Sequence, residues 1–522
     1  MHLEFKLYTM KKLFLVITAL LCAANVWCAS KVWIGNIYYT LDETNKTASV
    51  SHPYAVKERY AGEISIPSSF IYNSETYTVT CVDNAFVGAV YLTSIDIPST
   101  ITTFLANPFD GCDALVKVNY LGTIDEWVQI NFEQRRSNPL CVSKNLYIKD
   151  NLVEDVELTS ASQVKDFAFY NCTSLKSLKI GDTVESIGEN AFYGCTGLNF
   201  VEIGSGVQKI EENAFEKSSS INSIVWGARK CECSEPFESS ASSVKSFVFK
   251  EGVEEIPGPL CVLMNGVQEI VIPKSVTSVQ ANSLPKGGAL KTVVWNAKNC
   301  SDISRPLFSR MLLDEEGNMD HVITNKTITS FSFGDEVEYI PTNLCYGIEN
   351  IEKINVPSSV QKIGEKAFYG CKSLYDVAIG EGVTEIGDSA FYNCVNIEKV
   401  TSYPVSVPKV NDGMFNASMI NGYHYSFLYV PCASFDEYCN DPVFGKFKIV
   451  RCTDGSKQEI LDIEEYLSDA NITISEGKIL CEDKELSIYN TKGQDVTSLN
   501  GALPAGVYVL QIGEDRVKVM VK

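Results

Sequence analysis

Short runs of alternating apolar and polar residues return at a regular interval through the middle of the chain. In residues 175–180, Leu178 and Ile180 alternate with Ser177 and Lys179. This alternation is typical of a strand with one buried face, so the pattern predicts one short strand per repeat. The same slot recurs at residues 198–203, 221–226, 244–249, 267–272, 290–295, 351–356 and 374–379.

Each run follows an anchor residue, usually in the pair Ala-Phe and in some turns with Leu in place of Phe. Neighbouring anchors mostly stand 22 to 24 residues apart, over more than 300 residues. This period predicts a solenoid of about 14 turns of about 23 residues, in which each turn buries its apolar side against its neighbours. The gap after Phe109 fits one degenerate turn at Pro139 and Leu140. The anchors are Phe86, Phe109, Phe169, Phe192, Phe215, Phe237, Leu260, Leu284, Leu307, Leu344, Phe368, Phe391 and Phe415.

Stacked turns place their strands in one parallel sheet, and we expect the anchors in short helical or 3-10 segments on the opposite side. A cysteine often stands three residues after the anchor, and a fixed slot of this kind indicates packing by a small apolar group. Fifteen extra residues near 311–326 predict a hairpin excursion. The cysteines of the fixed slot are Cys112, Cys172, Cys195, Cys371 and Cys394.

The two ends of the chain differ from the repeats. Lys11 and Lys12 precede about a dozen apolar residues, which is typical of a secretory signal peptide. The last 50 residues contain short alternating strands joined by turn residues. The expected division is a signal peptide at 1–29, a β cap at 30–78, the solenoid at 79–427, a closing cap at 428–452, a linker at 453–470 and a β-sandwich at 471–522.

The motif in residues 187–203, Ile-Gly-x-x-Ala-Phe-x-x-Cys-x-x-Leu-x-x-Val-x-Ile, resembles the BspA-like leucine-rich repeat family (LRR_5 type) of bacterial surface proteins. The resemblance implies an α/β-type leucine-rich repeat solenoid and a role in adhesion. The tail, with Tyr489, Asn490 and the sequence Ala-Gly-Val-Tyr at 505–508, resembles the sorting domain of the type IX secretion pathway. An ordinary terminal β-domain is the alternative interpretation of the tail.

Composition argues against several functions. Lys and Arg number 44 against 65 Asp and Glu, a net charge of −21 that disfavours nucleic-acid binding. With four histidines and no nucleotide-binding, metalloprotease or hydrolase motif, we expect no catalytic, cofactor or metal site. The closely spaced cysteines Cys231 and Cys233 lack the second cysteine pair or the nearby histidine of a zinc site, so they do not predict one. The closing-cap cysteines could be thiols or a disulfide, and an acidic turn at 314–320 is interpreted as solvated. The closing-cap cysteines are Cys432, Cys439 and Cys452, and the acidic turn carries Asp314, Glu316, Asn318 and Asp320.

The outward positions of the predicted sheet supply the candidate ligand-binding residues. Valines occupy one such position in four consecutive turns, where a solvated sheet usually carries polar residues. Either they reflect strand propensity beneath a covering loop, or they form an apolar strip that binds a partner. The candidate ligand-binding residues are Val225, Val248, Val271, Val294 and Phe200.

Together these features predict an exported, monomeric, non-catalytic protein of the cell surface or extracellular space. It is expected to have no transmembrane helix and no cofactor, and to bind host or neighbouring-cell proteins or glycans. Two alternatives remain open. One is a structural surface-layer component, and the other is an enzyme that acts on polysaccharide or protein through a converging pair of carboxylates.

Overall fold

The computed structural model describes most of the chain from Ser30 to Val521. The expected signal peptide lies outside the described residues, as do Asp314, Glu316 and Asn318 of the acidic turn and most of the expected linker. The residues not described are 1–29, 54–59, 314–318, 411–412, 416–425, 448, 455–457, 461–471, 476–477, 482–484, 491–493, 505, 513–514 and 522. The chain divides into two compact units, Met1–Val201 with Lys209–Ser220, and Glu202–Gln208 with Ile221–Lys522.

The first unit begins with antiparallel strands and continues in parallel ones. Strands β1, β2 and β3 pair antiparallel, and β3 then pairs parallel with β6. Its first strands are β1 (Lys31–Ile34), β2 (Ile37–Asp42), β3 (Thr47–Ser51), β4 (Ala61–Ser65), β5 (Ser69–Tyr72), β6 (Glu75–Asp83), β7 (Tyr91–Ile97), β8 (Thr103–Leu105), β9 (Lys117–Tyr120) and β10 (Asn131–Phe132). The helices α2 (Ile124–Trp127), η1 (Arg135–Ser137) and α3 (Leu140–Ser143) follow β9.

The remaining strands of the first unit form separate long and short parallel ladders. The long strands join in the order β13-β15-β17 and the two-residue strands in the order β14-β16-β18. These strands are β11 (Leu146–Ile148), β12 (Asn151–Leu152), β13 (Asp155–Leu158), β14 (Gln163–Val164), β15 (Ser177–Ile180), β16 (Ser186–Ile187), β17 (Phe200–Ile203), which ends in the second unit, and β18 (Lys209–Ile210).

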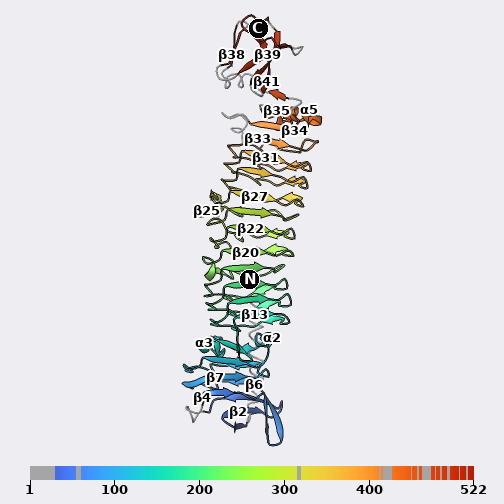
Figure 1. Cartoon of the computed structure of the whole chain (residues 1–522). Helices are drawn as coiled ribbons and strands as arrows, with labels where there is room; N and C mark the ends of the chain where they lie inside the picture. The colour runs from blue at the N-terminus through green and yellow to red at the C-terminus, as the bar shows by residue number, and fades with distance from the viewer. Residues whose placement is uncertain are drawn as a thin grey trace. The chain divides into compact units, whose positions relative to one another are not determined.

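The second unit repeats this arrangement (Figure 1). Val271 on β22 pairs with Val294 on β24, which is a shift of one 23-residue turn. Its repeat strands are β19 (Ser223–Trp226), β20 (Ser246–Phe249), β21 (Glu255–Ile256), β22 (Glu269–Ile272), β23 (Ser278–Val279), β24 (Thr292–Trp295), β27 (Ser330–Phe333), β28 (Tyr339–Ile340), β29 (Lys353–Asn355), β30 (Lys362–Ile363), β31 (Asp376–Ile379), β32 (Glu385–Ile386) and β33 (Lys399–Ser402). The expected hairpin is present as β25 (Arg310–Leu313) and β26 (Met319–Ile323).

The second unit ends in a closing segment and two antiparallel sheets. Strand β36, which lies in the stretch expected to be a linker, pairs antiparallel with β35. Ile449 of β35 shares an apolar cluster with Ile479, Ile488 and Leu510 of the tail. These elements are β34 (Phe427–Val430), η3 (Cys432–Ser434), α5 (Phe435–Asn440), η4 (Phe444–Lys446), β35 (Ile449–Cys452), β36 (Gln458–Ile460), β37 (Ile472–Ser475), β38 (Lys478–Cys481), β39 (Leu486–Asn490), η5 (Thr497–Leu499), β40 (Gly506–Ile512) and β41 (Asp515–Val521).

The anchor rings stack in columns within each unit. In the first unit, the ring of Phe192 stacks on Phe169 at 5.3 Å and on Phe215 at 5.1 Å, with interplanar angles of 10°. In the second unit, the rings of Phe368 and Phe391 stack at 5.0 Å. The anchors are buried, including the leucines that replace Phe. Together with the parallel ladders, these contacts confirm a repeat solenoid with mostly parallel sheets.

The expectation of a short helix at each anchor is wrong for most turns. Phe169, Phe192 and Phe391 lie in runs of turns or isolated bridges. The 3-10 helix η2 (Glu238–Ser240), which follows Phe237, is an exception. Residues with positive φ stand two positions before and two positions after many anchors, as Asn190 (φ of 55°) and Gly194 (φ of 70°) do around Phe192. The three residues between them are too few for a helical turn.

The cysteine slot has a hydrogen-bonding role in addition to packing. The thiol of Cys195 donates to the carbonyl oxygen of Phe169 at 3.2 Å, and Cys394 repeats this contact with Phe368 at 3.1 Å. Ser218 fills the same slot after Phe215, and its hydroxyl donates to the carbonyl of Phe192 at 2.6 Å. The slot therefore supplies a donor for a buried carbonyl of the preceding turn.

We predict that Phe192→Ala lowers the free energy of unfolding by about 3–5 kcal/mol, because it opens a cavity in the ring column. Phe192→Leu should cost on the order of 1 kcal/mol, because leucine serves as the anchor in other turns. Urea unfolding followed by circular dichroism measures both losses. Equal losses for the two variants would contradict the column as a source of stability.

We predict that Ser218→Ala lowers the free energy of unfolding by about 1–3 kcal/mol. The substitution removes the donor to Phe192 and the acceptor of the Cys195 backbone N–H, which lies 3.0 Å from the hydroxyl. Ser218→Cys should cost less, since a thiol fills the equivalent position in other turns. The same unfolding measurement tests the order, and a larger loss for Ser218→Cys than for Ser218→Ala would reverse it.

Candidate binding face

Four strands of the second unit carry the predicted valine positions. In β19, β20, β22 and β24 the second and fourth residues are buried, as Ile270 and Ile272 are in β22. The first and third residues point outward, so the strands present two rows of side chains. Val225 pairs in register with Val248, and Val271 with Val294. Strands β20 and β22 are in contact although they belong to separate hydrogen-bonded ladders.

The two central valines are open to solvent. Val248 exposes 49 % and Val271 exposes 42 % of its surface, whereas Val225 and Val294 are half-buried. Phe200 is also half-buried and belongs to the first unit. The structure therefore brings the four valines onto neighbouring strands of one unit, which we call the valine strip. A covering loop does not account for Val248 and Val271, because both remain exposed.

The second outward row is polar. Ser223 pairs with Ser246, and Glu269 pairs with Thr292. Beyond the strip, Val294 pairs with the exposed Ser332 of β27, where the apolar row ends. The apolar area is thus one side chain wide and flanked by hydroxyl and carboxylate groups. A surface of this kind can combine apolar contact with hydrogen bonds to a partner.

Ion pairs follow the ends of these strands and connect one turn to another. The ammonium of Lys250 pairs with Glu202, and the stem of Lys250 lies against Gly227, where an added Cβ would meet its Cδ at 3.2 Å. Arg229 pairs with Glu254 and lowers the pKa of that carboxyl. Further along, Lys274 reaches Glu336 at 3.4 Å and Lys298 reaches Glu338 at 3.1 Å. These ion pairs link one turn of the second unit to another on its surface.

A shallow cavity of about 400 Å³ elsewhere in the second unit bears on the enzyme alternative. It is lined by Glu352, Ser373, Tyr375, Asn396 and Glu398. The two glutamates precede β29 and β33, which are separated by β31, so their backbones lie about 10 Å apart at ordinary strand spacing. Both side chains are exposed. Neither carboxylate has the buried setting of a glycosidase's general acid.

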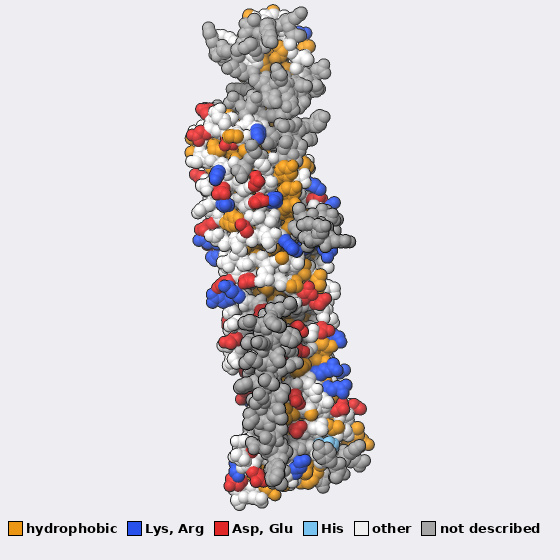
Figure 2. Space-filling model, turned by 180° about the vertical axis from the view of Figure 1, so that it is seen from behind, with side chains coloured by type: hydrophobic (Ala, Val, Ile, Leu, Met, Phe, Trp, Pro, Cys, Tyr) orange, Lys and Arg blue, Asp and Glu red, His pale blue; other side chains and the backbone are white. Residues whose placement is uncertain are grey.

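Charged side chains of both signs are interspersed over the face shown in Figure 2. Among the described residues, no helix is long and apolar enough to cross a membrane.

One group of metal-ligating side chains comes together in the described part of the chain: Cys432, Cys452 and Asp454. The two cysteines could be singled out from the sequence, but Asp454 could not, because it lies outside the repeat pattern, two residues beyond Cys452.

The fold and this face define a leucine-rich repeat solenoid. A family model described as the BspA type leucine rich repeat region matches residues 63–161, 162–310 and 320–428, in 6 copies. The chain belongs to this family. No curated protein matches the chain.

Several solved structures are similar at low identity. A leucine-rich cell surface protein from Faecalibacterium prausnitzii is 19 % identical, covering 72 % of this chain and 95 % of its own, with a TM-score of 0.34. A leucine-rich repeat protein from Bacteroides ovatus is also 19 % identical, covering 71 % and 94 %, with a TM-score of 0.37. The pneumococcal vaccine antigen PcpA is 15 % identical, covering 81 % and 97 %, with a TM-score of 0.31.

We predict that Val248→Lys and Val271→Lys each change the free energy of unfolding by less than about 0.5 kcal/mol, because both side chains can extend into water. Ile270→Lys, one position away and buried, should cost about 4 kcal/mol or more because it buries an unpaired charge. Thermal unfolding of the three variants provides the comparison. A severe loss at Val271 would mean that this side chain packs inside the protein.

Proposed function

We propose that this protein is an exported cell-surface or extracellular binding protein that captures protein or glycan partners through its sheet face. The observation that carries the proposal is the valine strip, with Val248 and Val271 exposed beside a polar row. Membership of a family of surface-type repeat proteins supports the adhesin-like role.

The ends of the chain complete the proposal. Residues 1–29 act as the export signal, 30–78 and 428–452 close the apolar ends of the solenoid at 79–427, and 453–470 connects it to the tail. A solenoid requires such caps because its terminal turns lack a neighbour on one side. The tail at 471–522 serves in sorting or surface attachment, which its antiparallel strands and its sequence resemblance support.

A binding screen of the mature chain against immobilised extracellular-matrix proteins, mucins and glycans tests the function. The double variant Val248→Lys, Val271→Lys should weaken the captured interaction at least about tenfold, since each lysine places a hydrated charge in the apolar contact. A matched control, Ser332→Lys with Asn355→Lys, adds the same charge at exposed outward positions beyond the strip.

The same experiments have two outcomes that would count against the proposal. Equal weakening by the strip variant and its control would indicate a general charge effect and would remove the strip from the proposal. Failure to capture any ligand, together with self-assembly of the purified chain, would favour a structural surface-layer component.

A further inference from the structure

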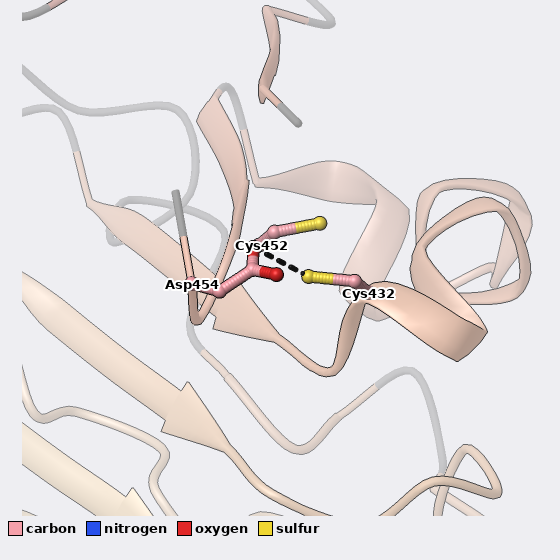
Figure 3. A group of neighbouring side chains, drawn as sticks. All are labelled: Cys432, Cys452 and Asp454. Carbon is pink, nitrogen blue, oxygen red and sulfur yellow. Dashed lines mark hydrogen bonds between the residues drawn. The ribbon is translucent and has the colours of Figure 1, made fainter. Parts of the chain in front are cut away.

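Three potential metal ligands converge in the closing segment of the second unit (Figure 3). Cys432 begins the 3-10 helix η3 directly after β34, and Cys452 ends the neighbouring strand β35. Asp454 follows two residues later in the turn that leaves β35. Because β34 and β35 pair in parallel with Val430 opposite Cys452, their continuing chains bring these side chains to the same end of the sheet.

The spacing of the donor atoms suits a small cation. The two sulfurs and a carboxylate oxygen all lie within 4.8 Å of one another, and the thiol of Cys432 donates to Asp454 Oδ1 at 2.8 Å. In a tetrahedral zinc site, metal–ligand bonds of about 2.3 Å to sulfur and about 2.0 Å to oxygen place the ligand atoms roughly 3.5–3.8 Å apart. Small side-chain rotations would reach that geometry.

The burial of the three residues also fits a site with one open side. Cys452 is 1 % exposed, Cys432 is half-buried and Asp454 is exposed. The buried thiol supplies a fixed donor, while the carboxylate borders solvent and leaves room for a water ligand. Two sulfur donors select against calcium and magnesium, which require oxygen ligands, and favour zinc or another thiophilic cation.

We propose that Cys432, Cys452 and Asp454 form a binding site for Zn²⁺, with three protein ligands and a water in the fourth position. On binding, the two thiols release two protons and the ion takes two thiolates and one carboxylate, so that the occupied site carries one net negative charge. The ion ties the start of η3 to the end of β35. This site is separate from the valine strip and does not depend on its function.

Cadmium titration of the full mature chain, reduced and freed of metal with a chelator, provides the direct test. Thiolate ligation should produce an ultraviolet charge-transfer band that saturates at one equivalent, and Zn²⁺ should displace the bound cadmium. Cys432→Ser should abolish the band. Asp454→Asn, which retains both thiols, should weaken cadmium affinity at least about tenfold.

Cys141→Ser is the matched control, because Cys141 is a half-buried thiol far away in the sequence and in the first unit. It should leave both the band and the affinity unchanged, and circular dichroism should confirm that every variant is folded. Absence of the band in the reduced parent chain would overturn the proposal, as would its persistence in Cys432→Ser. Peptide mapping without reductant supplies a further check: a Cys432–Cys452 disulfide in the isolated chain that prevents zinc uptake would also overturn it.

Discussion

Burial of each turn against its neighbour is the constraint on which the rest of the structure depends. A turn of about 23 residues is too small to enclose its own apolar side chains, so its anchor ring must lie on the ring of the next turn. The stacks of Phe169, Phe192 and Phe215 in the first unit and of Phe368 and Phe391 in the second show this contact. Once the rings are stacked, the strands of successive turns lie in register.

The register of the strands in turn determines which side chains lie next to one another on the surface of the sheet. A shift of one period brings Val271 beside Val294, so a residue type repeated at one position becomes a continuous row on the sheet. The solenoid can therefore build a binding face from single substitutions in successive turns without altering its core.

The parts of the structure that follow the repeat were predictable from the sequence. Alternation identified strands such as β15 and β22, and the anchor spacing identified the ring column. The second parallel ladder was missed because strands such as β21 and β23 contain only two residues and show no alternation. The expected anchor helices were wrong because left-handed residues on both sides of an anchor, such as Asn190 and Gly194 around Phe192, leave too few residues between them for a helical turn.

The valine strip and the cysteine–aspartate cluster also differ in how far the sequence predicts them. The position of the valine strip could be predicted from the sequence, since its members occupy one slot of the repeat. The exposure of Val248 and Val271 could not be predicted, because it depends on the packing of the neighbouring turns. The cluster of Cys432, Cys452 and Asp454 arises where the repeat ends and two chain segments leave the sheet together. No period in the sequence connects these residues.

Cysteine scanning along β22, with labelling by a water-soluble thiol reagent and peptide mass mapping, is the most direct test of the account. It measures whether the stacking of turns buries one face of the strand and leaves the other, with Val271, exposed to solvent. The account predicts fast labelling of cysteines placed at Glu269 and Val271 and strong protection at Ile270 and Ile272. Uniform labelling of all four positions, or protection at Val271 with rapid labelling at Ile270, would contradict it.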